Sequence, residues 1–167
     1  MNPILEVKDL NYIYSIGTPF EHKALDNVNF AINRGEFIGI MGGVQLDLMG
    51  QENAESAGKR QLSGIGGQLD FLEGAYRSKG GKGFICLNSA RKDKEGNLKS
   101  NIVPFIPGGS VVSGPRTMIQ YVATEYGVVK LSGLSLRERA QAMISIAHPA
   151  FHAELEAYAK EIELPLI

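Results

Sequence analysis

Glycine is concentrated in one stretch of this 167-residue chain, and this concentration limits what the stretch can form. Between Leu46 and Gly83, short apolar pieces alternate with glycine- and serine-rich runs, of which Ser63–Gly67 and Ser78–Gly83 are the densest. Glycine weakens the interior of a helix or strand, but it lets the backbone turn sharply or approach a ligand closely. We therefore expect loops at both runs, with either a tight turn or a ligand contact as the reason for the glycines.

The N-terminal 42 residues read as β-structure. Strands are predicted at 4–10 and at 28–32, where apolar and polar residues alternate, and at 37–41, an apolar run of strand length. Asn33-Arg34-Gly35 is a turn sequence. The pattern therefore predicts two strands, 28–32 and 37–41, joined by a tight turn.

The rest of the chain mixes strands and helices. Strands are predicted at 84–87, around 102–103 and at 120–124, with an exposed hairpin tip at 91–99. Ser135 and Glu138 have the spacing of a capping box, which predicts the start of a helix that ends before Pro149. A second helix is predicted at 150–162. The fold class indicated is α/β.

Composition argues against several binding partners and cellular locations. Lys and Arg total 17 against 18 Asp and Glu, so the net charge of −1 favours neither nucleic acid nor an anionic membrane. Cys86 is the only cysteine, which leaves no intrachain disulfide and fits a reducing cytoplasm. No apolar stretch approaches the roughly 18 residues of a membrane span, and no apolar signal core begins the chain. We expect a cytoplasmic protein without membrane insertion and without a metal site.

The first 42 residues resemble the ATP-binding subunits of energy-coupling-factor ABC transporters. The resemblance depends on Leu10–Ser15, Gly17–Glu21, Ala24–Val28 and Gly35–Gly42. In that family the last block leads into the phosphate loop, but here Gly43–Met49 contains no lysine and no Ser or Thr. Because these groups hold the phosphates and magnesium, the chain lacks the residues that ATP hydrolysis requires. Tyr14 matches the aromatic position that stacks on adenine and is the one nucleotide-stacking candidate.

From about Gly43 to Glu163 the chain resembles the C-terminal portion of acetyl-CoA hydrolase/transferases, and in particular butyrate- and 4-hydroxybutyrate-type CoA-transferases. Ala150 and His152 depart from the family pattern, on the last helix. Seven blocks in order carry the resemblance: Gln45–Gln51, Ala54–Ser56, Ser63–Phe71, Ser78–Lys82, Thr124–Gly127, Ser135–Ala140 and Ile146–Pro149.

The resemblance implies a covalent mechanism, in which a glutamate attacks the acyl-CoA thioester and then carries CoA as a glutamyl thioester. That glutamate precedes the part of the family retained here, and no residue of this chain matches it. Glu52, Glu55 and Glu125 are therefore interpreted as structural. Glycine amides can donate to an oxyanion, and lysines can meet CoA phosphates. The oxyanion and CoA-binding candidates are Gly64, Gly66, Gly67, Gln68, Lys79, Gly80, Gly81 and Lys82.

The expected organisation is a truncated ABC-ATPase-like β-segment, 1–42, followed by an incomplete CoA-transferase-like α/β domain, 43–167. The first hypothesis is a CoA-transferase fragment that binds CoA or acyl-CoA, without a covalently bound cofactor and without turnover. Two alternatives remain: a remnant of an ATP-binding transport subunit, and a non-catalytic fusion or assembly partner. Apolar faces left without their neighbours favour association, so a homo-oligomer is also expected.

Overall fold

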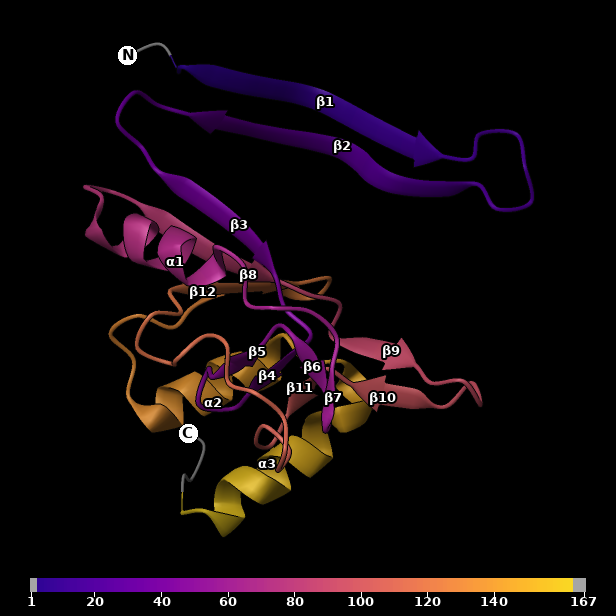
Figure 1. The fold of residues 1–167 in the computed structure, drawn as a ribbon, viewed down its shortest axis with the longest axis vertical. Coiled ribbons are helices and arrows are strands. Elements are labelled where there is room, and N and C mark those ends of the chain that lie inside the picture. Colours follow the sequence, from indigo (N-terminus) through magenta and orange to yellow (C-terminus); the bar gives the residue numbers. More distant parts are fainter. Residues whose placement is uncertain (1–2, 164–167) are drawn as a thin grey trace. The chain divides into compact units, whose positions relative to one another are not determined.

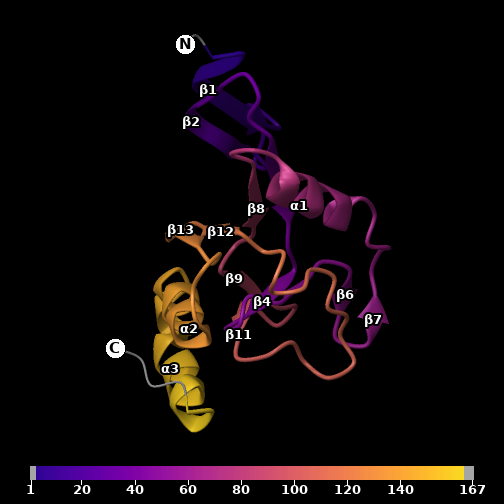
Figure 2. The ribbon, with the colours of Figure 1, turned by 90° about the vertical axis from the view of Figure 1, so that its left-hand side faces the viewer.

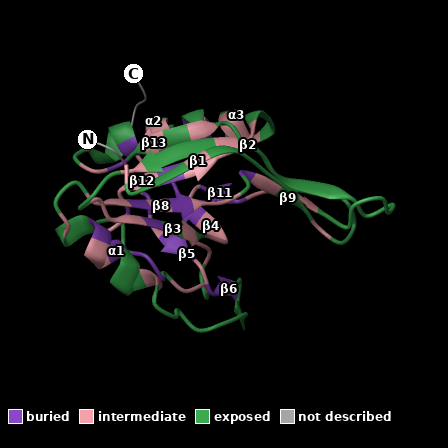
Figure 3. Ribbon diagram, turned by 90° about the horizontal axis from the view of Figure 1, so that it is seen from above, coloured by how far each residue is buried: buried purple, intermediate pink, exposed green. Residues whose placement is uncertain are grey.

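A computed structural model describes residues 3–163, which divide after Glu36 into two compact units. The first unit is an antiparallel hairpin of β1 (Leu5–Tyr14) and β2 (His22–Ile32) (Figure 1). Its register shifts at three points, and Asn side chains compensate there: the Asn29 Oδ1 accepts the Asp9 N–H at 2.8 Å. No residue of either strand is buried (Figure 3). The N-terminal hairpin is thus confirmed, held together by main-chain pairing rather than by a core.

The strands predicted at 28–32 and 37–41 both form and are joined by a tight turn, but they pair with other strands and not with each other. The turn between them does form, with Gly35 at φ +86° and the Glu36 N–H donating to the Asn33 carbonyl at 3.2 Å. However, β2 pairs with β1, while β3 (Ile38–Gly42) pairs in parallel with β8 (Lys82–Cys86). A tight turn only permits pairing, whereas β3 gains a main-chain partner in β8 and partial burial of Ile38 and Met41 by joining the larger sheet.

The second unit is built on a four-stranded sheet with the order β13-β12-β8-β3. The strands β3, β8 and β12 (Tyr121–Thr124) are parallel, and β13 (Gly127–Lys130) runs antiparallel to β12. Helix α1 (Gln68–Arg77), which the sequence did not predict, lies beside β3 and β8 (Figure 2). Gly83 permits this close packing, because a Cβ there would lie only 3.3 Å from Leu72 and 3.4 Å from Ala75.

The sheet positions that alternate with those under α1 are open to solvent. Ile40 on β3 is 72% exposed, and Val128 on β13 is also exposed. Between them, the rings of Phe84 and Tyr121 stack with centroids 4.8 Å apart. These four side chains form what we call the open sheet face.

A smaller sheet and two hairpins complete the β-structure. The strand β4 pairs in parallel with β11 and antiparallel with β5, and the predicted hairpin at 91–99 is confirmed as β9 and β10. The bounds are β4 Gln45–Asp47, β5 Glu52–Asn53, β6 Ser56–Ala57, β7 Arg60–Gln61, β9 Ala90–Lys92, β10 Leu98–Ser100 and β11 Ile102–Val103.

Both predicted C-terminal helices form. The helix α2 (Leu136–Ser145) begins with the complete Ser135–Glu138 capping box. A short 3-10 helix, Pro149–Phe151, leads into α3 (His152–Glu161), which packs beside α2. No helix within residues 3–163 has both the length and the apolar character that a membrane crossing requires. The hydrophobic core includes Leu46, Leu48, Leu72, Ile85, Ile102, Ile119, Val122, Leu131, Met143 and Leu155.

Candidate functional site

The carboxyl ends of the three parallel strands meet at one edge of the sheet. An open cavity of about 620 Å³ lies there, lined by Gly43 after β3, Cys86–Asn88 at the end of β8, and Ala123–Glu125 at the end of β12. In open α/β sheets, ligands bind outside the carboxyl ends of the strands. This cavity, the strand-edge cavity, is therefore the first candidate site.

Two ionisable groups line the strand-edge cavity, and their pKa values are shifted in opposite directions: that of Cys86 is raised and that of Glu125 is lowered. The Cys86 thiol is half-buried, and burial raises its pKa, so it stays neutral near pH 7. Burial would also raise the pKa of Glu125, but its hydrogen bonds from the Ser89 hydroxyl (2.5 Å) and N–H (2.9 Å) outweigh burial and hold it below its ordinary value. Glu125 is thus an ionised carboxylate held in place by Ser89.

The glycine-rich run Ser63–Gly67 forms an exposed loop that is held at both ends by one segment of chain. The Glu55 carbonyl accepts the N–H groups of Leu62 (2.7 Å) and Ser63 (3.2 Å). At the other end, the Gln68 Nε2 donates to the Glu52 Oε2 at 2.5 Å. The loop is therefore fixed at its ends, while its middle remains open to solvent.

The glycine-rich loop also forms the N-terminus of α1. Gly67 is the N-cap and offers no side chain to the N–H groups of the first turn. Gly66 has φ +57°, a conformation that favours glycine. Free N–H groups at a helix N-terminus can donate to an anion or to a carbonyl oxygen. The loop therefore has the chemistry expected of an oxyanion or phosphate contact.

Glu52 connects the glycine-rich loop to the strand-edge cavity. Its side chain is fully buried between two glycines: a Cβ on Gly43 would lie 3.0 Å from the Glu52 Oε1, and one on Gly114 would lie 2.6 Å from Oε2. Within the described chain, Oε1 has no hydrogen-bond partner. Burial raises the pKa of Glu52 from 4.5 to about 7, against the opposing effect of the Gln68 hydrogen bond.

The structure separates the predicted site residues into two groups. Gly64, Gly66, Gly67 and Gln68 lie at the N-terminus of α1, whereas Lys79–Lys82 follows its C-terminus. Ten helical residues span about 15 Å, so the two groups do not converge on one point. A tight turn accounts for the second group's glycines, because Gly80 has φ +74° and a Cβ on Gly81 would lie 2.2 Å from the Ala75 carbonyl oxygen.

Tyr14, the nucleotide-stacking candidate, lies at the end of β1 in the first unit. Its ring is exposed and contacts the edge of the Tyr12 ring, with centroids 4.8 Å apart.

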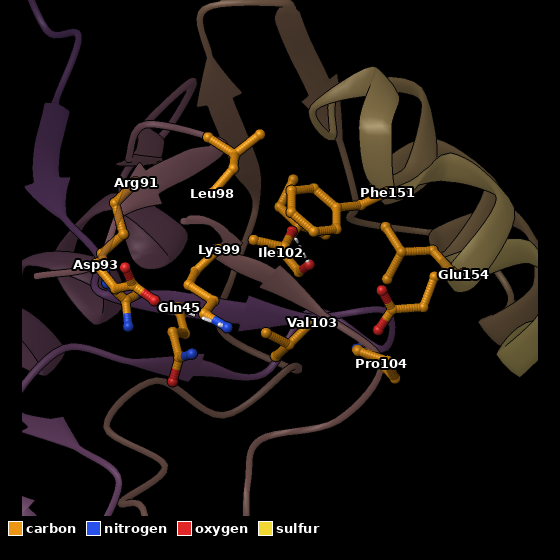
Figure 4. A pocket seen from close by; sticks show the side chains of 12 residues that line it. Gln45, Arg91, Asp93, Leu98, Lys99, Ile102, Val103, Pro104, Phe151 and Glu154 are labelled. Atoms are coloured by element: carbon orange, nitrogen blue, oxygen red, sulfur yellow. Dashed lines mark hydrogen bonds and ion pairs between the residues drawn. The ribbon is translucent and has the colours of Figure 1, made fainter. Parts of the chain in front are cut away.

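A second cavity, of about 480 Å³, lies between the β9–β10 hairpin, the end of β11 and α3 (Figure 4). Its charged side chains have both signs: Arg91 donates to the Asn101 side chain at 2.5 Å, and Lys99 lies 3.8 Å from Asp93. Because Arg91 and Lys99 already interact with Asn101 and Asp93 of the chain itself, the cavity shows no preference for a ligand of one charge. Across residues 3–163, His, Cys, Asp and Glu side chains form no cluster of three that could hold a metal ion.

Sequence reasoning missed the strand-edge cavity and the burial of Glu52 against the glycine-rich loop. The cavity depends on parallel pairing of strands that are about 40 residues apart, which no local pattern reports. The Glu52 burial had one local signal, its place shortly after Leu46, Leu48 and Met49, but this pattern does not distinguish a buried from an exposed glutamate.

An α/β domain with an open cavity at its parallel strand ends, and with a glycine-rich loop at a helix N-terminus, is of the ligand-binding class. The chain belongs to the acetyl-CoA hydrolase/transferase C-terminal domain family, which matches residues 10–159. It is 48% identical over 128 residues to the butyryl-CoA:acetate CoA-transferase of Anaerostipes caccae, a match covering 77% of this chain and 29% of that protein.

Solved structures agree with this assignment. RipA from Yersinia pestis matches with a TM-score of 0.67 and 43% identity, over 76% of this chain and 28% of that one. A 4-hydroxybutyrate CoA-transferase from Porphyromonas gingivalis matches with a TM-score of 0.57 and 38% identity, over 75% and 26%. The resemblance to CoA-transferases and the α/β fold are confirmed. The chain spans less than a third of the length of these relatives.

The N-terminal segment has a separate, short similarity. An energy-coupling factor transporter ATP-binding protein of Acetivibrio thermocellus is 55% identical over 38 residues, which is 23% of this chain and 14% of that protein. The transferase family match begins at residue 10 and so overlaps a transporter-like segment. The division of the chain at Gly42/Gly43 stays a prediction, and the two compact units meet at Glu36/Phe37.

Proposed function

We propose that this chain is the C-terminal part of an acyl-CoA:carboxylate CoA-transferase, acting in the cytoplasm, which binds CoA or acyl-CoA but does not turn it over alone. One observation carries the proposal: the exposed glycine-rich loop is fixed at one end by the Glu55 carbonyl and at the other by Glu52, whose carboxyl lies against Gly43 of the strand-edge cavity. A fixed loop with free glycine amides can donate to a thioester carbonyl without a large ordering cost.

Neither Glu52 nor Glu125 is placed to act as a substitute nucleophile. Glu52 is fully buried, so a thioester carbon cannot reach it. Glu125 reaches the strand-edge cavity, but both of its oxygens accept hydrogen bonds from Ser89. A carboxylate held in this way is a weaker nucleophile, because its lone pairs are stabilised. Turnover would therefore need a glutamate supplied by another segment or another chain.

A thermal-shift titration with CoA, acetyl-CoA and Mg-ATP tests the proposal. A ligand at 100 times its Kd should stabilise the fold by about 2.7 kcal/mol. We expect a shift with the two CoA compounds and none with Mg-ATP. A shift with Mg-ATP alone would instead favour the transporter-subunit alternative, and no shift with any compound would refute CoA binding by this chain.

Matched glycine variants locate the binding site. Gly66 in the loop and Gly96 in the β9–β10 hairpin both have positive φ, and a Cβ on either would meet no atom within 4 Å. The two alanine substitutions should therefore cost similar amounts of stability. Only Gly66→Ala should weaken CoA binding, by about tenfold, and equal weakening by Gly96→Ala would contradict the assignment of the loop.

The open sheet face favours a second candidate function, that of an assembly partner. Ile40 and Val128 are exposed and flank the half-buried rings of Phe84 and Tyr121, so this face presents apolar surface, and exposed apolar patches favour association. Sedimentation at increasing concentration checks this function. Concentration-dependent oligomers that Ile40→Lys abolishes would support it, and a monomer at all concentrations would contradict it.

A further inference from the structure

The proposed function uses the buried Glu52 as an anchor of the glycine-rich loop but gives no role to its ionisation. Glu52 lies on β5, and its two oxygens have different surroundings: Oε2 accepts the Gln68 Nε2 at 2.5 Å, while Oε1 has no hydrogen-bond partner among the described residues. A buried polar atom without a partner is costly and calls for an explanation. The glycines that flank the carboxyl, Gly43 and Gly114, leave the room that it occupies.

We propose that Glu52 is a positioning residue for the glycine-rich loop: its carboxyl holds Gln68, and the proton on that carboxyl sets how firmly Ser63–Gly67 is held. The loop itself is established by the structure. That its amides contact CoA rests on the proposed function above.

The two protonation states of Glu52 differ in what the buried site can tolerate. As a neutral acid, the group keeps the Gln68 hydrogen bond and brings no charge into the interior. As a carboxylate, it carries a charge with a single hydrogen bond, which a buried site tolerates poorly. Entry of water or displacement of the carboxyl would relieve this cost, and either change would move Gln68 and with it the first turn of α1.

The side chains around Glu52 are not ionisable, so the change between its two protonation states involves Glu52 alone. From α1 it faces Gln68; around the flanking glycines lie Ile85 of β8, Leu46 of β4 and Ile119. None of these side chains titrates. Burial is the largest cause of the raised pKa of about 7, with the Gln68 hydrogen bond opposing it, and no charged neighbour contributes. The transition should therefore follow a single-proton curve near neutral pH.

Amide NMR of the full chain between pH 5 and 9 tests the proposal without any ligand. The Gln68 side-chain NH₂ and the backbone N–H groups of Gly66 and Gly67 should shift together, with one midpoint near pH 7. In Glu52→Gln, which is neutral and nearly isosteric, these shifts should be lost. In Gln68→Ala, the Gly66 and Gly67 shifts should shrink several-fold, because the connection to Glu52 is removed.

Glu55→Gln is the matched control. It neutralises a carboxyl three residues away, on the same segment, and leaves the main-chain bonds of Glu55 to the loop in place. The titration of the loop should persist in this variant. Loop amides that do not respond to pH, or that respond equally in Glu52→Gln, would overturn the proposal.

A parallel measurement separates this proposal from the proposed function. The Kd for CoA, measured by calorimetry at pH 6 and pH 8, should change several-fold in the wild type and stay constant in Glu52→Gln. If CoA binds at neither pH while the loop still titrates through Glu52, CoA binding is refuted and the positioning role stands. If CoA binds equally at both pH values and the loop does not titrate, the positioning role is refuted alone.

Discussion

The hairpin strands β1 and β2 and the central strand β8 of the α/β unit have similar apolar content but differ in burial. In β1 and β2 no side chain is buried, although Leu10, Tyr12 and Phe30 are among them. In β8, which is half as long, Gly83 and Ile85 are buried. Main-chain pairing is present in both, so pairing alone does not produce a core.

The difference lies in what covers each sheet. β8 has strands on both sides and α1 against one face, so alternate side chains leave water. The hairpin has only its own two strands, and a two-stranded hairpin by itself is marginally stable in water. Burial of apolar area provides the main stabilisation of a fold, so the second unit should hold most of the chain's unfolding free energy. The predictions below test that distribution.

The largest loss is expected from Leu72→Ala on α1. Leu72 is fully buried and packs against Gly83 of β8, so its truncation leaves a cavity in the core. Such substitutions cost about 2–5 kcal/mol. Urea denaturation followed by far-UV circular dichroism measures the loss. Leu69→Ala, on the exposed side of the same helix, is the control and should cost less than about 1 kcal/mol.

The next effect is a dependence of stability on pH that comes from Glu52. Its pKa is raised in the folded protein from 4.5 to about 7, so its proton is bound more tightly there than in the unfolded chain. Its contribution is therefore complete below pH 4.5 and is lost as pH rises to about 7. The size is about 3 kcal/mol, from 1.36 kcal/mol per pKa unit.

Glu52→Gln isolates this contribution. Urea midpoints measured at pH 5 and pH 8 should fall with rising pH in the wild type and should fall much less in the variant. Equal pH dependence in the two proteins would show that other groups cause it.

A smaller effect is expected from Ser135→Ala. Ser135 caps α2, its Oγ accepting the Glu138 N–H, while the Glu138 carboxylate accepts the Ser135 N–H at 2.7 Å. Loss of an N-cap costs about 1 kcal/mol. Ser132→Ala, in the preceding turn and outside the cap, should cost less, and an equal cost in both variants would argue that the capping box contributes little.

Local signals predicted the elements that depend on local contacts. The capping box at Ser135 and Glu138 gave the start of α2, and the apolar run around Ile85 gave β8, because each pattern is complete within a few residues. Helix α1 was missed because its sequence contains Gly74 and follows a glycine-rich run. That helix is stabilised by packing on Gly39 and Gly83, which no window of sequence around α1 contains.

For the candidate site too, the grouping of residues close together in the sequence was predicted, and contacts between distant residues were not. The glycine-rich loop and Gln68 were predicted as a group, and the structure places them together at the start of α1. Lys79 and Lys82 were assigned to the same ligand, but α1 separates them from the loop. The burial of Glu52 could not be predicted, because it depends on Gly43, Gly114 and Ile119, which only the folded chain brings together.

The smallest effect is expected in the hairpin, from Phe30→Ala. Phe30 is 42% exposed and pairs across the hairpin with Val7, so truncation removes a contact on a surface that water already reaches. The unfolding free energy of the α/β unit should change by less than about 0.5 kcal/mol, within the range of ordinary surface substitutions. Urea denaturation on the same scale as Leu72→Ala makes the comparison direct. A loss of 2 kcal/mol or more would mean that Phe30 packs against further structure in solution, and the contrast between the two units would then not hold.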